Sequence, residues 1–104
     1  MSAKVMTIFR NRLRDENAAE YAKTAARMSE LAQNMPGYVD SKTFLSSDGE
    51  RVTIVTFADR DSHNAWRNHL EHQQAQRDGI ASYYSEYSIL VGDVTYEHSF
   101  RLEQ

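Results

Sequence analysis

Apolar and polar residues alternate with a period of two at the start of the chain. The apolar side chains lie on both faces of residues 3–13: Val5, Phe9 and Leu13 on one face, Met6 and Ile8 on the other. Alternation of this kind is typical of a β-strand, and apolar residues on both faces indicate that both faces are covered. We therefore expect a strand over 3–13 that lies between two packed layers.

From residue 15 onward the apolar residues recur at steps of three and four. Between Ala18 and Met35 they form one continuous stripe along a helix. The pattern predicts a helix over 15–35, with Asp15 as its cap and the Pro-Gly pair at 36–37 as its end.

Two more strands and a second helix are predicted next. Residues 38–46 and 51–58 have strand-like patterns, and the Asp48-Gly49 pair between them favours a tight hairpin. Residues 59–77 then form a polar helical stretch, with Asp59 or Asp61 as the cap and Gly79 as the end.

The last segment, 85–101, is one long alternating run in which Gly92 is the natural place for a bulge or bend. A typical strand has only about 3–10 residues. Such a long strand would extend beyond its own sheet, so we expect its far part to pair with a second subunit.

The order of these elements, β-α-β-β-α-β, predicts one ferredoxin-like α+β domain over 1–104 with an antiparallel sheet. Both helices would cover one face of the sheet. The other face is apolar at Met6 and Ile8, and a monomer would leave it exposed. Packing two sheets face to face would bury it, so a homodimer is expected.

Charge and composition exclude several classes of partner and chemistry. Twelve basic and fifteen acidic residues give a net charge of −3, and basic residues do not form a stripe. Nucleic acid and membrane surfaces are therefore not expected as partners. The chain has no cysteine, which excludes disulfides and thiolate catalysis and fits a cytoplasmic protein.

The predicted second helix carries the most chemically informative residues. Trp66, His69 and His72 follow one another at steps of three, so on a continuous helix they share one broad face. A neutral histidine can act as a general base near pH 7, and a tryptophan offers a flat wall to an aromatic ligand. The alternatives are a core role for Trp66, and histidines at the helix rim that bond to water or to Glu71.

Other polar residues are candidates for the same pocket. Asn11 lies within the apolar face of the first strand, where its amide can orient a substrate carbonyl or a bound oxygen species. Alternatively, Asn11 faces solvent at the strand end. Tyr83, Tyr84 and Tyr87 can add hydroxyls at the pocket mouth or simply pack with their hydroxyls in water. His69-x-x-His72 lacks a third ligand, so no metal is expected.

Several local patterns together resemble the antibiotic biosynthesis monooxygenase (ABM) family. They are Asn11-Arg12-Leu13, Met35-Pro36-Gly37-Tyr38, Val52-Thr53-Ile54-Val55-Thr56-Phe57 and Ala65-Trp66-Arg67-x-His69-x-x-His72, followed by the long last strand. The resemblance implies a dimeric α+β barrel. It also implies oxidation of a small aromatic, phenol-type molecule by O₂ without an obligate cofactor.

The residue pattern and the resemblance together suggest roles for particular residues. The catalytic candidates are His72, His69, Asn11 and Trp66, and the substrate-binding candidates are Phe9, Trp66, Tyr83, Tyr87 and Gln76. In the proposed chemistry, His72 or His69 deprotonates the phenol, and the phenolate reduces O₂.

Two alternatives remain open at this point. A haem-degrading branch of the same superfamily has an Asn at the end of strand one, a Trp in helix two and an iron-ligating His about three helical turns later. Asn11 and Trp66 match that pattern, but the residue ten positions after Trp66 is Gln76. The other alternative is a ligand-binding or structural dimer without catalysis.

Overall fold

Four strands form one antiparallel sheet in the order β2-β3-β1-β4. The strands are β1 (Val5–Leu13), β2 (Tyr38–Leu45), β3 (Arg51–Phe57) and β4 (Tyr84–Asp93). The structure is a computed structural model that describes residues 3–103. Its element order and sheet confirm the predicted ferredoxin-like α+β fold.

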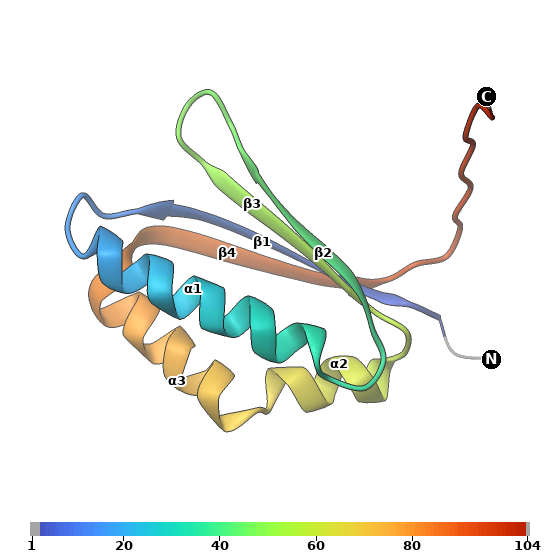
Figure 1. Cartoon of the computed structure of the whole chain (residues 1–104), viewed down its shortest axis with the longest axis horizontal. Helices are drawn as coiled ribbons and strands as arrows, with labels where there is room; N and C mark the ends of the chain where they lie inside the picture. Colours follow the sequence, from blue (N-terminus) through green and yellow to red (C-terminus); the bar gives the residue numbers. More distant parts are fainter. Residues whose placement is uncertain (1–2, 104) are drawn as a thin grey trace.

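The helices all lie on one face of this sheet (Figure 1). They are α1 (Ala18–Gln33), α2 (Arg60–Arg67) and α3 (Leu70–Asp78), followed by a short π-helix, η1 (Gly79–Tyr83). Within residues 3–103, no helix is long and apolar enough to cross a membrane.

The strand register determines which side chains face the helices. Phe57 packs with Trp66 of α2, so Phe57 and every second residue of β3 back to Arg51 point toward the helices. Arg51 pairs with Asn11 of β1, and Asn11 pairs with Tyr87 of β4. These three residues therefore lie side by side on the helix-covered face.

The opposite face of the sheet has no helix over it (Figure 1). Its apolar residues follow from the same register: Met6, Ile8, Phe44, Val52, Ile54 and Leu90. Leu90 is 58% exposed and Phe44 is 47% exposed. This set, called the outer apolar face below, is the second apolar sheet face expected from the sequence.

The single helix predicted over 59–77 is wrong, because the chain breaks between α2 and α3 at Asn68 and His69. Asp59 caps α2 as predicted, since its carboxylate accepts a hydrogen bond from the Ser62 N–H at 2.7 Å. His69 then has extended backbone angles, and its ring caps α3 by accepting from the Glu71 N–H. The first N–H groups of a helix have no partner within that helix, so the new start at α3 needs a cap, and His69 provides it.

The first helix starts later than predicted, at Ala18 rather than near Asp15. Its cap is Asn17, which has a left-handed backbone with φ of 64° and makes no capping bond with its side chain. Asparagine tolerates this conformation better than most residues. The Asn17 amide donates instead to the Ser82 carbonyl of η1 and ties the two segments together.

The long strand predicted over 85–101 ends at Asp93, because β1 offers it no partner beyond Val5. The Val94 N–H still donates to the Lys4 carbonyl, and after that the chain leaves the sheet (Figure 1). Gly92 stays in register opposite Met6, so β4 has no bulge at that position. The register shift in this pair of strands lies at Arg12 and Leu13 instead.

Candidate functional site

The break between α2 and α3 brings His72 into contact with Trp66. Their rings stack with centroids 4.2 Å apart and planes 12° apart, and the His69 ring lies 6.0 Å from the Trp66 ring. In a continuous helix, residues six apart are separated by about 9 Å along the axis and cannot stack. The three residues do come together, but through the break rather than along one helix face.

The hydrogen bond of His72 assigns its protonation state. Its Nδ1 lies 3.1 Å from the carbonyl oxygen of Trp66, which can only accept, so Nδ1 carries the proton. Burial lowers the pKa of His72 below its ordinary value, although the bond to the Trp66 carbonyl acts in the opposite direction. At neutral pH the ring is uncharged, and Nε2 is left with a free lone pair.

His69 has the opposite arrangement. Its Nδ1 accepts the Glu71 N–H at 3.1 Å, so this nitrogen is unprotonated and already used as the helix cap. The neutral ring must then carry its proton on Nε2 and has no free acceptor nitrogen. Of the two histidines named as candidate bases, only His72 therefore offers a free lone pair.

Trp66 lies in the hydrophobic core. It is 7% exposed and clusters with Ala32 and Phe57, with Met28 and Leu31 packed alongside. One face of the indole supports the His72 ring, so the core holds the imidazole in place through Trp66.

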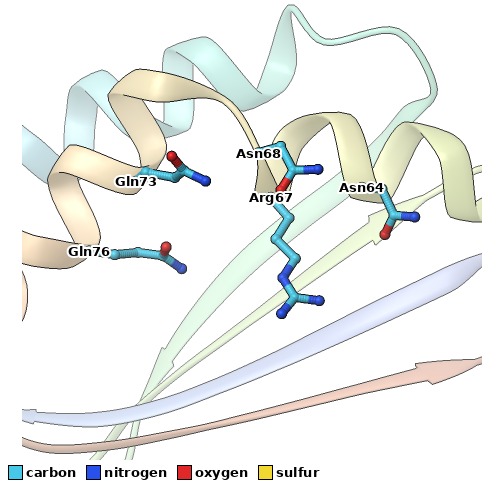
Figure 2. Close-up of a pocket in the computed structure, with 5 residues that line it drawn as sticks. All are labelled: Asn64, Arg67, Asn68, Gln73 and Gln76. Carbon is cyan, nitrogen blue, oxygen red and sulfur yellow. The ribbon is translucent and has the colours of Figure 1, made fainter.

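A groove of about 520 Å³ lies beside the helix break. Its lining is entirely polar and consists of Asn64, Arg67, Asn68, Gln73 and Gln76. Figure 2 shows Arg67 extending from the end of α2 toward the sheet, with Gln73 and Gln76 on α3 to one side. Gln76 is a predicted binding residue, and the other four were not predicted. The signal that could have found them is the unusual number of amide side chains between 64 and 76.

The helix-facing side of the edge strand β4 is only half covered. Tyr87, Ile89 and Val91 share this side and are 43–45% exposed. The ring of Phe9 on β1 lies 5.8 Å from that of Tyr87 and 5.4 Å from that of Tyr84. The predicted binding residues Phe9 and Tyr87 therefore belong to an apolar, aromatic surface on the side of the sheet that carries the helices.

Asn11 is buried, which contradicts the alternative of an asparagine facing solvent. It is 2% exposed, and its Oδ1 has no hydrogen-bond partner among the described residues. The Nε of its neighbour Arg51 is likewise buried without a partner there. Arg51 was not predicted, although it falls on the same alternation as Val55 and Phe57.

The tyrosines at the junction of η1 and β4, Tyr83 and Tyr84, are packed rather than free. The Tyr83 hydroxyl lies 3.3 Å from the Thr24 hydroxyl of α1, and its ring packs against Tyr21. Burial raises the pKa of Tyr84, so this phenol stays protonated at neutral pH. The structure places Tyr83 between η1 and α1, where its hydroxyl contacts the protein.

Across residues 3–103 there is no group of three or more His, Asp or Glu side chains that could hold a metal ion. Gln76, the residue ten positions after Trp66, lies in the groove wall. A glutamine there does not supply the imidazole that the haem-degrading pattern requires.

Comparison with known proteins identifies the family of this chain. Residues 4–78 match the family described as antibiotic biosynthesis monooxygenase. The uncharacterized protein YqjZ of Bacillus subtilis (strain 168) is 33% identical over 89 residues, which cover 86% of this chain and 78% of that protein.

Two solved structures share the fold at low sequence identity. One is Rv0793 from Mycobacterium tuberculosis, with a TM-score of 0.81 and 16% identity, over 93% of this chain and 100% of the other. The second is SnoaB, a cofactor-independent oxygenase from Streptomyces nogalater, with a TM-score of 0.77 and 15% identity, over 92% of this chain and 97% of the other. On the family match and the Bacillus relative, the chain belongs to the antibiotic biosynthesis monooxygenase family.

Proposed function

We propose that this protein oxidises a small phenol-type aromatic molecule with O₂ and without an obligate cofactor. The observation that carries the proposal is the state of His72: a neutral imidazole, with Nδ1–H bound to the Trp66 carbonyl and with Nε2 free to accept a proton. The similarity of the fold to that of a cofactor-independent oxygenase supports the same chemistry.

The reaction begins with proton transfer from the phenol to Nε2 of His72. The resulting phenolate is electron-rich and gives an electron to O₂. The oxygen then bonds to the ring carbon opposite the hydroxyl. The peroxide takes the proton back from His72, and loss of water then breaks the O–O bond. A phenol plus O₂ thus becomes a quinone plus water, and no external reductant is needed.

The remaining residues would bind and orient the substrate. The aromatic surface around Phe9 and Tyr87 suits a planar ring, and the groove lined by Arg67 and Gln76 suits its polar substituents. The unpaired amide of Asn11 is available to an oxygen substituent. Trp66 acts through His72, because it is stacked on that ring and buried behind it.

The test is O₂ uptake with 9-hydroxyanthracene, whose oxidation yields anthraquinone and water. A general base typically contributes about 10²- to 10⁴-fold to the rate, so His72→Gln should lower turnover by that factor. His69→Gln is the matched control: it removes a helix cap but no free base, and it should cost less than tenfold. Equal activity of wild type and His72→Gln would refute the assignment, and a haem titration with a Soret shift would favour the haem-degrading alternative.

We also propose that the protein acts as a homodimer. The outer apolar face is open in the single chain, and residues 94–103 carry Tyr96, Phe100 and Leu102 with 71–82% exposure. In that segment the apolar residues fall on every second position, as in a strand that has one buried face. A second copy would cover both features at once, since each copy brings the same face and the same segment.

A further inference from the structure

Two buried polar atoms on neighbouring strands lack partners. One is Oδ1 of Asn11 on β1, and the other is Nε of Arg51 on β3. The two residues are direct cross-strand partners, which places their Cβ atoms about 4.5–5.5 Å apart. By the strand register, both side chains are on the helix-covered face. They lie near the end of β1 and the start of β3, which meet at one end of the sheet.

Arg51 differs from the other arginines of the sheet. Arg10 forms an ion pair with Glu50, and Arg12 forms ion pairs with Asp48 and Glu86. Within residues 3–103, Arg51 has no carboxylate in such a pair, and its guanidinium lies 5.6 Å from the ring centre of Tyr21. A half-buried cation without an anion is costly, so this arrangement requires a reason.

The chemistry of the two atoms selects one kind of ligand. Oδ1 of Asn11 can only accept a hydrogen bond, and Nε of Arg51 can only donate one. A carboxylate cannot donate to Asn11, and an ammonium group cannot accept from Arg51. A hydroxyl group or a water molecule does both at once and so satisfies the pair.

The neighbouring side chains indicate what carries that hydroxyl. Tyr21 packs over the Arg51 guanidinium, and the Tyr21 and Tyr84 rings lie 6.0 Å apart. Phe9 and Tyr87 continue this set of rings along the sheet. Aromatic walls around one polar pair suit an aromatic ring with a hydroxyl substituent.

We propose that Asn11 and Arg51 bind an aromatic hydroxyl group, which donates to Oδ1 of Asn11 and accepts from Nε of Arg51. When this proton is lost, the charge of Arg51 stabilises the phenolate, because a hydrogen bond from a charged donor is roughly twice as strong as a neutral one. The inference rests on the proposed function only in taking the natural ligand to be a phenol. A cation in contact with an acidic group typically lowers its pKa by about 1–3 units. Tyr84 lies near this guanidinium, and burial raises the pKa of its phenol, so Tyr84 does not supply a negative charge at neutral pH.

The test uses 4-nitrophenol, whose absorbance reports its own ionisation, and needs no turnover. The pKa of the probe bound to the wild type should be about one unit or more below the pKa of free 4-nitrophenol. A shift of one unit means that the protein binds the phenolate about tenfold more tightly than the neutral phenol. Arg51→Gln should abolish this shift, and Arg51→Lys should retain part of it. Arg77→Gln, which removes an arginine of α3 that bonds to Gln74, should leave the shift in place. Asn11→Leu should reduce the preference for 4-nitrophenol over 4-nitroanisole, which cannot donate a hydrogen bond.

Unchanged ionisation of the probe in Arg51→Gln, or no binding by the folded wild type, would overturn the proposal and leave the pair as a site for a buried water. The outcomes also separate the two proposals. In His72→Gln the probe should still bind with its shifted pKa while O₂ uptake falls. A shifted probe with no oxidation of any phenol refutes the proposed function alone, whereas oxidation without a shift refutes this inference alone.

Discussion

Replacing Leu90 with aspartate tests whether the outer apolar face joins two copies of the chain. Leu90 lies on that face on the edge strand β4, opposite Ile8 of β1, and is 58% exposed in the single chain. Full burial of a leucine side chain is worth about 1.5–3 kcal/mol, so covering the exposed part gives about 1–2 kcal/mol per subunit. A symmetric dimer contains the contact twice, so its loss raises the dissociation constant at least about 30-fold, before any cost of burying the charge.

The assay is sedimentation equilibrium between 1 and 100 µM. The wild type should sediment at twice the chain mass of 12.0 kDa, and Leu90→Asp should shift toward the monomer. Leu70→Asp is the matched control, because Leu70 is 79% exposed on α3, on the helical side of the molecule. The reasoning fails if the wild type is monomeric at 100 µM, or if the two variants dissociate equally.

Two further predictions concern stability. Gly37 has a φ of 81°, and a Cβ there would clash with the Ser62 side chain, so Gly37→Ala should cost about 2 kcal/mol or more in urea denaturation. Gly92→Ala meets no atom within 4 Å and should stay within about 0.5 kcal/mol of wild type; equal effects would contradict this explanation. Burial lowers the pKa of His72 in the folded state, so the unfolded chain binds the proton more tightly. Stability should therefore decline as pH falls below about 6.5, the ordinary value, and through the lower folded-state pKa. His72→Gln should show less of this decline in chemical denaturation at pH 7 and pH 5, and an identical decline in both proteins would count against a buried neutral imidazole.

The fold was predictable because its signals are local. The Asp48-Gly49 turn, the stripe of α1 and the Asp59 cap each depend on residues close in sequence. The break at His69 has no such signal, because histidine is not a usual helix cap and the polar residues around it suit a helix surface. The end of β4 was missed for another reason: it depends on where β1 begins, which only the strand register determines.

The candidate site was predictable in part. Trp66 and His72 stood out by residue type, but their contact comes from a break that periodicity does not show. The choice between His72 and His69 depends on which ring nitrogen is bonded, a property of geometry alone. Arg51 was missed because it becomes a site candidate only through its pairing with Asn11 on the neighbouring strand. The two residues are forty positions apart in the sequence.

The stacking of His72 on Trp66 also gives the protein an internal optical probe. Trp66 is the only tryptophan in the chain, so all indole emission originates beside this imidazole. A neutral imidazole and an imidazolium differ in how strongly they quench an indole in contact with them. The emission of the unmodified protein can therefore follow the proton on His72 during a titration or a single turnover, without any label.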